Sequence, residues 1–329
     1  MIEAQGLTKR YGEKTAVNGI TFTVQPGKVT GFLGPNGAGK STTMRMIMGL
    51  DRPTAGSVTV NGAPYASFRS PLTEVGALLE AKAVHTGRSA RNHLRALAAT
   101  HGIGDKRVDE VIDMTGLTAV AKRRVGGFSL GMGQRLGIAV ALLGDPRTLI
   151  LDEPVNGLDP EGVLWVRNLV KYLASEGRTV FLSSHLMSEM ALTADHLIVI
   201  GRGHIIADGP VQEIIDQGTK ATVRVRSPHA DQLATAIAGP DVTVGTPEPG
   251  VLQVSGATAE QIGDAAAAAH LTLHELTPLS GSLEEAYMSL TADEVEYRSD
   301  APGHPDGTPP DAAAFGTATA PSTTEEAAR

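Results

Sequence analysis

The sequence predicts an α/β fold in which a largely parallel sheet carries helices on its faces, with an antiparallel patch of strands beside it. Over residues 1–218, short apolar runs rich in β-branched residues alternate with amphipathic helical patterns. Such alternation is typical of strand–helix–strand units with buried parallel strands. Residues 21–24 and 57–62 instead alternate apolar and polar side chains beside turn residues, which predicts the antiparallel patch.

The strands of the parallel sheet are expected where the apolar runs are densest, at residues 29–33, 148–151, 179–182 and 196–200. Residues 82–145 are mostly helical in pattern and predict a helical subdomain.

A smaller domain is expected at residues 219–291, after a first domain at residues 1–218. Its segments follow the order strand, helix, strand, strand, helix, strand, at residues 221–226, 230–238, 242–244, 251–254, 259–270 and 271–276. A last helix is expected at residues 283–290. The βαββαβ order predicts a ferredoxin-like α+β domain.

The C-terminal segment, residues 292–329, is expected to be a disordered, acidic and proline-rich tail. From Ser299 onward it holds five prolines, five acidic residues, one arginine and one aromatic residue. Such a composition cannot bury enough apolar surface to fold.

Composition limits the functions that the chain can have. The 329 residues carry a net charge of −8 and hold no dense Lys/Arg block, which argues against a nucleic-acid partner. The sequence contains no cysteine, so it has no disulfide framework. The sequence contains no run of about 18 apolar residues, which is the length needed to span a bilayer. The first residues do not suggest a signal peptide. If the protein moves something across a membrane, another polypeptide must supply the path.

Residues 34–41, Gly-Pro-Asn-Gly-Ala-Gly-Lys-Ser, match the phosphate-binding pattern of P-loop NTPases between a strand and a helix. The glycines let backbone N–H groups point at phosphate oxygens, and the helix N-terminus adds positive potential. Lys40 is expected to reach the β- and γ-phosphates, and Ser41 to hold Mg²⁺. The predicted nucleotide-binding residues here are Gly34, Pro35, Asn36, Gly37, Ala38, Gly39, Lys40, Ser41 and Thr42.

A second site is predicted where the buried strand at residues 148–151 ends in Asp152 and Glu153. Ligands of open parallel sheets sit at the carboxyl ends of the strands, and buried carboxylates need partners. Asp152 is expected to bind Mg²⁺, and Glu153 to activate the attacking water as general base.

Residues 128–135, Phe-Ser-Leu-Gly-Met-Gly-Gln-Arg, resemble the signature motif of the ABC ATPases and lie about 20 residues before Asp152, as in that family. Residues 156–160, Asn-Gly-Leu-Asp-Pro, resemble its D-loop. His185 resembles its switch histidine, and Tyr11 resembles the aromatic residue that stacks on adenine. This resemblance extends over residues 1 to about 215.

The resemblance implies that two such domains sandwich ATP between the P-loop of one and the signature motif of the other. Lys40, Glu153 and His185 are then catalytic, while Ser129, Gly131 and Asp159 contact the nucleotide across the dimer. It further implies separate transmembrane permease subunits, a second copy or a paralogous ATPase as partner, and a peripheral position on the cytoplasmic face of the membrane.

The sequence departs from the family pattern in two places, and one of them points to a subgroup. Leu130 and Met132 stand where the family usually has glycine and glutamine, while Ser129 and Gly131 are kept. Glu80 replaces a usual glutamine and is expected to reach Mg²⁺ or water. The Glu80 substitution resembles bacitracin- and lantibiotic-resistance ATPases, and residues 282–287 resemble the end of the small C-terminal domain that daunorubicin-resistance ATPases often carry. They imply export of a small hydrophobic or amphipathic compound.

Alternatives remain at the level of the sequence. The chain could be an ABC-type ATPase that acts on nucleic acid or ribosomes, although it holds a single cassette and no sustained heptads between Lys40 and Asp152. It could also bind ATP without hydrolysing it, which the intact catalytic residues argue against. Four residues have a purely structural explanation: Tyr11 as an ordinary aromatic, His185 as a helix cap, Glu80 as a solvated acid and Asp159 as an N-cap.

Overall fold

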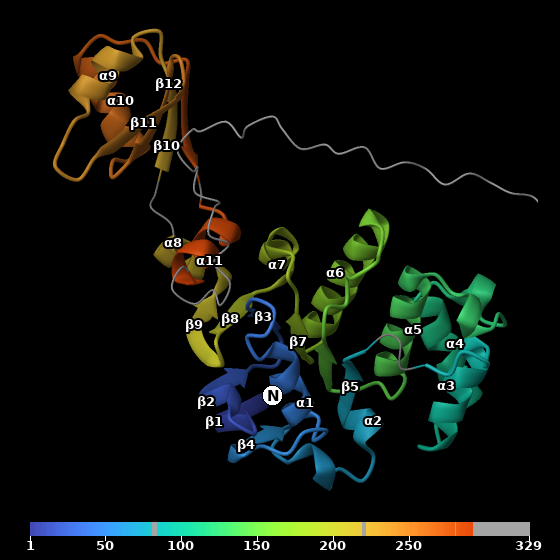
Figure 1. Ribbon diagram of the computed structural model, residues 1–329. Coiled ribbons are helices and arrows are strands. Elements are labelled where there is room, and N and C mark those ends of the chain that lie inside the picture. The colour runs from blue at the N-terminus through green and yellow to red at the C-terminus, as the bar shows by residue number, and fades with distance from the viewer. Residues whose placement is uncertain (81–83, 219–221, 280, 292–329) are drawn as a thin grey trace, which may run out of the picture. The chain divides into compact units, whose positions relative to one another are not determined.

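The computed structural model describes residues 1–80, 84–218, 222–279 and 281–291. A six-stranded sheet with the strand order β5-β6-β7-β3-β8-β9 forms the centre of the first domain (Figure 1). Neighbouring strands from β5 to β8 are parallel, and β9 runs antiparallel at the edge. The strands are β3 (Val29–Leu33), β5 (Val75–Leu78), β6 (Thr148–Leu151), β7 (Thr179–Ser183), β8 (His196–Gly201) and β9 (His204–Pro210). The predicted parallel sheet is therefore confirmed.

The antiparallel patch is also confirmed, as a separate three-stranded sheet with the order β2-β1-β4. Its strands are β1 (Ile2–Tyr11), β2 (Lys14–Val24) and β4 (Ala55–Val60). Their apolar residues alternate with polar ones, so that one face of this sheet is buried against the rest of the domain.

Two hydrophobic cores lie on the two faces of the central sheet. One joins the antiparallel sheet and α1 (Lys40–Ile47) to the central strands, with the rings of Phe22, Phe32 and Phe181 at centroid distances of 5.2 to 6.1 Å. The other packs α5 (Leu130–Leu142), α6 (Pro160–Ser175) and α7 (Met187–Thr193) against the opposite face. Side chains along each strand alternate between the two cores, which explains the continuous apolar runs.

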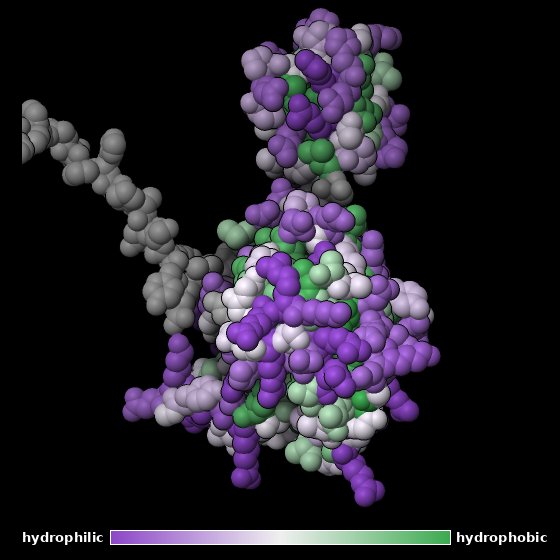
Figure 2. Space-filling view, turned by 90° about the vertical axis from the view of Figure 1, so that its right-hand side faces the viewer, coloured by the Kyte–Doolittle hydropathy of each residue, from purple (hydrophilic) through white to green (hydrophobic). Residues whose placement is uncertain are grey.

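The helical subdomain comprises α3 (Ala90–Ala99), α4 (Asp105–Met114) and α5, and short 3₁₀ turns at Thr118–Val120 and Val125–Gly127 lie before α5. Its outer surface is mostly hydrophilic (Figure 2). Arg91 pairs with Asp109 at 2.8 Å and Arg95 with Asp105 at 2.8 Å across α3 and α4. Two short helical turns, Tyr65–Ser67 and α2 (Pro71–Glu74), precede β5.

The smaller domain has the predicted ferredoxin-like order. It consists of β10 (Thr222–Arg226), α9 (Ala230–Ala236), β11 (Thr243–Glu248), β12 (Val251–Ser255), α10 (Ala259–Ala268) and β13 (Glu275–Leu279), with the antiparallel sheet order β11-β12-β10-β13. The expected last strand at residues 271–276 is wrong in position. Leu271 N bonds Ala266 O at the end of α10, and pairing with β10 begins at Glu275.

The last helix, α11 (Leu283–Thr291), packs against α8 (Val211–Gly218) of the first domain. A Cβ on Gly218 would lie 2.4 Å from Ala286 Cα, so the two helices approach closely at this point. Leu283 and Tyr287 join the larger core of the first domain. The helix that we assigned to the smaller domain thus packs on the first one, because its apolar side chains find their partners there.

The boundaries 1–218, 219–291 and 292–329 remain predictions, and the tail lies outside the described residues. Over the ranges that the structure describes, no helix combines the length and apolarity that crossing a membrane requires.

Candidate functional site

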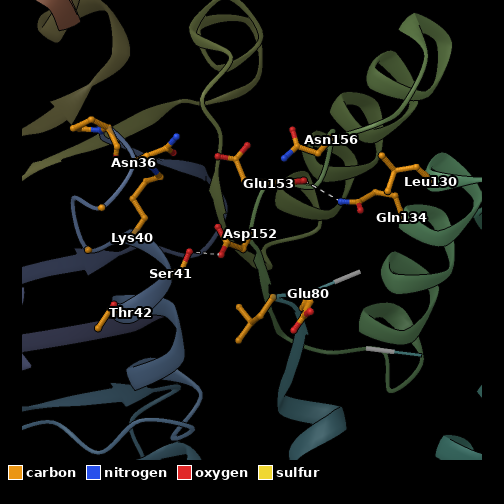
Figure 3. A pocket seen from close by; sticks show the side chains of 14 residues that line it. Asn36, Lys40, Ser41, Thr42, Glu80, Leu130, Gln134, Asp152, Glu153 and Asn156 are labelled. Carbon is orange, nitrogen blue, oxygen red and sulfur yellow. Dashed lines mark hydrogen bonds between the residues drawn. The ribbon is translucent and has the colours of Figure 1, made fainter. Parts of the chain in front are cut away.

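The site lies where several parallel strands end. The loops that follow β3, β5, β6 and β7 all leave the same edge of the sheet, because parallel strands share their carboxyl end. A cavity of about 450 Å³ opens there (Figure 3). It is lined by Pro35, Asn36, Gly37, Gly39, Lys40, Ser41, Thr42, Leu79, Glu80, Leu130, Gln134, Asp152, Glu153 and Asn156.

The loop between β3 and α1 needs glycine at particular positions. Gly39 has a φ of 112°, and a Cβ there would lie 2.7 Å from Ala16 O. At Gly34 a Cβ would lie 2.3 Å from Ile200 O. The backbone can therefore curl into a phosphate-binding loop only without these side chains.

Lys40 begins α1 and is buried, with 7% of its surface exposed. Its Nζ donates to Gly34 O at 2.6 Å and to Pro35 O at 3.2 Å. Burial lowers the pKa of the Lys40 amine, while the nearby carboxylates of Glu153 and Asp152 act in the opposite direction. A buried cation between a phosphate-binding loop and two carboxylates suits a polyanionic ligand with a bound metal ion.

Ser41 and Asp152 meet although 111 residues separate them. Ser41 Oγ donates to Asp152 Oδ2 at 2.7 Å (Figure 3), and Ser183 Oγ donates to Asp152 Oδ1 at 2.5 Å. Hydroxyl and carboxylate oxygens are ligands that Mg²⁺ prefers, so this pair fits the predicted ion. Among the described residues no three His, Asp or Glu side chains gather closely enough to hold a metal.

Glu153 is held in an unusual backbone conformation, with a φ of 51°. Its N–H donates to Ser183 Oγ at 3.0 Å, and its carboxylate Oε2 lies 2.7 Å from His185 Nδ1. The backbone N–H of His185 donates to the same oxygen at 3.3 Å. These contacts orient the carboxylate at the mouth of the cavity.

Several predicted site residues do not line the cavity. Gly34 and Ala38 belong to the loop but do not line the cavity, and Ala38 is buried. Tyr11 lies at the end of β1, is half-exposed, and its hydroxyl donates to Asp51 Oδ2 at 3.0 Å. Burial, and then the hydrogen bond to Asp51, raise the pKa of the Tyr11 hydroxyl. The Tyr11 ring is thus accessible to a nucleotide base such as adenine, but it lies outside the cavity.

The signature-like segment and the D-loop-like segment contribute helix caps. Ser129 Oγ accepts from Met132 N at 3.2 Å at the start of α5, and Asp159 Oδ1 accepts from Gly162 N at 2.9 Å at the start of α6. Neither Ser129 nor Gly131 lines the cavity of its own chain. Asp159 is an N-cap, as its structural explanation requires.

Sequence reasoning missed Ser183, Gln134 and Asn156. Ser183 ends β7 beside Asp152, and a serine closing an apolar strand was a usable signal. Gln134 lies on α5, and no local pattern shows that it points to Glu153 O, 19 residues away. Glu80 lines the cavity, and its role near Mg²⁺ or water stays a prediction.

Comparisons with known proteins agree with this geometry. Residues 17–156 match the family model described as ABC transporter, and residues 221–284 match a domain of unknown function, DUF8746.

Among curated relatives, the bacitracin transport ATP-binding protein BcrA of Bacillus licheniformis is 41% identical over 223 residues, covering 67% of this chain and 73% of the relative. The lantibiotic transport ATP-binding protein SrtF of Streptococcus pyogenes is 38% identical, covering 63% and 90%. The uncharacterized ABC transporter ATP-binding protein YhcH of Bacillus subtilis is 34% identical over 301 residues, covering 90% and 97%. The similarity to YhcH thus extends into the smaller domain.

Solved structures show the same fold. An ATP-binding subunit of an ABC transporter superposes with a TM-score of 0.61 at 26% identity, covering 66% of this chain and 92% of that one. A dimeric ATP-binding cassette in a post-hydrolysis state, bound to ADP and Pi, gives a TM-score of 0.59 at 23% identity, covering 64% and 98%.

Proposed function

Because this chain belongs to the ABC transporter ATP-binding proteins and is an ATPase, we propose that it powers export of a small hydrophobic or amphipathic compound through separate membrane subunits. The single observation that carries the proposal is the clustering of Lys40, Ser41, Asp152 and Glu153 around one cavity, with His185 bonded to Glu153. This cluster contains the groups needed to bind ATP and to hydrolyse it.

ATP binding is assigned to the loop at residues 34–42. Its backbone N–H groups and the N-terminus of α1 surround the phosphates, and Lys40 neutralises the β- and γ-phosphate charge. Mg²⁺, held by Ser41 and Asp152 and approached by Glu80, would neutralise negative charge on the phosphates when bound. Tyr11 offers an exposed ring for stacking on adenine.

Hydrolysis is assigned to Glu153 and His185. The Glu153 carboxylate accepts a proton from the water that attacks the γ-phosphate. His185, bonded to Glu153 Oε2 through Nδ1, fixes the orientation of that carboxylate and leaves its other ring nitrogen available to the phosphate. Ser183 holds Asp152 and Glu153 together through its hydroxyl.

A second molecule completes the site. Ser129 and Gly131 lie at the N-terminus of α5, which attracts anions, but they do not line the cavity of their own chain. In a head-to-tail dimer, they and Asp159 would approach the nucleotide bound to the partner. The partner is a second copy or a paralogous ATPase, and a dimeric cassette of the same fold supports this arrangement.

The exported compound is inferred from relatives whose names specify bacitracin and lantibiotic transport. These names suggest an antibiotic as the class of cargo. The chain is then peripheral, on the cytoplasmic face of the membrane, and bound to permease subunits rather than to nucleic acid.

Co-purification tests this function. The full chain is tagged, extracted from membranes in mild detergent, and its partners are identified by mass spectrometry. Recovery of a protein with about six apolar spans supports the proposal. Recovery of ribosomal proteins or DNA without a membrane partner contradicts it.

A further inference from the structure

We propose that Gln134 is a positioning residue that couples the first turns of α5 to the general base Glu153. The inference rests on the proposed role of Glu153 and extends it, because it names a structural link between the surface that contacts the partner's nucleotide and the base of the chain's own site.

The contact itself is direct. Gln134 is 3% exposed, and its Nε2 donates to Glu153 O at 2.9 Å (Figure 3). A buried amide that bonds a backbone carbonyl contributes geometry, since breaking the bond leaves two buried polar groups without partners. Gln134 also lines the cavity but carries no charge with which to bind phosphate.

Glu153 needs such support. Its φ of 51° lies in the left-handed region, which a glutamate occupies only when its surroundings hold it there. Its N–H is bound by Ser183 on β7, and its carboxylate is bound by His185 after the same strand. Its carbonyl is bound by Gln134 from the helical subdomain. The direction of the carboxylate therefore depends on two separate structural units.

A second contact joins the same units. Leu130 in the first turn of α5 packs so closely on Gly157 that a Cβ at Gly157 would lie 2.2 Å from Leu130 Cδ2. The first turns of α5 thus touch Glu153 itself and, at Gly157, the segment that follows it. Leu130 also lines the cavity and is 57% exposed, so this turn is accessible to a second molecule.

The link follows from the place of Ser129. This residue caps α5 five positions before Gln134, or about 7 Å along the helix axis. If the partner's nucleotide draws Ser129 and the first turn of α5 toward it, the rigid helix carries Gln134 with it. The Glu153 carbonyl then moves, and the carboxylate reaches its working direction only when α5 is engaged. Gln134 would make hydrolysis in one site depend on ATP in the other.

The test measures ATP hydrolysis by the full chain with its membrane partners, comparing wild type with Gln134→Leu and Gln134→Glu. Leucine and glutamate fill about the same space as glutamine. Neither the apolar leucine side chain nor an ionised glutamate can donate a hydrogen bond to the Glu153 carbonyl. We expect kcat to fall roughly 10- to 100-fold, as for a misplaced catalytic group, with the KM for ATP within about twofold. The Hill coefficient for ATP should fall toward 1.

Thr115→Val is the matched control. Thr115 is buried at the end of α4, and its Oγ1 donates to Val111 O at 2.8 Å, so this variant of similar size removes a buried side-chain bond to a backbone carbonyl away from the cavity. It should lower the thermal midpoint, while kcat and cooperativity stay within about twofold of wild type.

The double variant Gln134→Leu/Glu153→Gln separates the two assignments. If Gln134 acts through Glu153, the double variant should hydrolyse ATP in a single turnover at the rate of Glu153→Gln alone. A single-turnover rate in the double variant below that of Glu153→Gln overturns the inference. Wild-type kcat and cooperativity in folded Gln134→Leu and Gln134→Glu also overturn it. Turnover that survives Glu153→Gln instead overturns the base assignment on which both proposals stand.

Discussion

His185 Nδ1 lies 2.7 Å from Glu153 Oε2, although the two residues are 32 positions apart in the chain. Glu153 follows β6 and His185 follows β7, and these neighbouring parallel strands bring the two side chains to the same edge of the sheet. The contact brings two motifs that lie apart in the sequence together at one edge of the sheet.

Replacing His185 should impair hydrolysis and spare binding. We expect His185→Ala to lower kcat by roughly 100-fold or more, since the Glu153 carboxylate loses the group that orients it. Nucleotide affinity, measured by equilibrium binding of a fluorescent ATP analogue, should stay close to wild type. His101→Ala, which removes an exposed histidine bonded to Thr100 at the end of α3, is the control. Wild-type turnover in His185→Ala would contradict this role.

Replacing glycine by alanine should have opposite effects on the free energy of unfolding at two positions, Gly39 and Gly263. Gly39→Ala forces a side chain into a backbone with a φ of 112° and toward Ala16 O, so the free energy of unfolding should fall by about 1–3 kcal/mol and ATP binding should be lost. Gly263 lies in α10, where a Cβ meets ordinary contacts, so Gly263→Ala should raise stability by about 1 kcal/mol. Urea unfolding and nucleotide titration measure both. Tight ATP binding by Gly39→Ala would contradict the loop assignment.

Asp159 can act as a helix cap, as a nucleotide contact across the dimer, or as both. Asp159→Ser keeps a capping oxygen and removes the charge, whereas Asp159→Ala removes both. Asp159→Ala should lower stability by about 1 kcal/mol, and Asp159→Ser should restore most of it. If kcat stays low in Asp159→Ser, the carboxylate acts beyond the cap. Full activity in Asp159→Ser would leave it with the cap alone.

Because of His93, the free energy of unfolding should be lower at mildly acidic pH than at neutral pH. It is buried in α3 with its Nδ1 unpartnered, and burial, with nearby Arg88 and His85, lowers its pKa. The folded-state pKa is below the unfolded value of about 6.5, so the unfolded chain takes up its proton first as the pH falls. The stability that the neutral ring provides is therefore present above about pH 6.5 and lost below it.

Urea unfolding from about pH 7.5 to about pH 5.5 measures this effect. His93→Leu removes the titrating ring and fills the buried site with an apolar side chain, so it should lose less stability over this interval than wild type. Equal losses in the two proteins would show that His93 does not cause the acid sensitivity.

Much of the fold could be predicted because local patterns agree with the packing. The apolar runs at residues 29–33 and 148–151 are strands with the expected bounds, since a buried parallel strand needs apolar residues on both faces. The strand expected at residues 271–276 was misplaced because Leu271 and Leu273 pack on the small core from a loop, so their apolar character serves burial without pairing.

The cavity lining could be predicted where residue type and backbone setting coincide, as in the glycine loop and the paired acids. What could not be predicted depends on distant parts of the chain. No local signal shows that Gln134 reaches Glu153 O, or that α11 returns to α8 of the first domain. Such contacts arise from tertiary packing, which short patterns do not encode.

Glu153 is proposed as the general base of an ATP-dependent dimer, and Glu153→Gln tests this role most directly. The amide keeps the size of the side chain but cannot accept the proton of water. We expect this variant to bind MgATP with near-wild-type affinity, to lose nearly all turnover, and to elute as a stable dimer in MgATP but not in MgADP. Hydrolysis at the wild-type rate would contradict the account.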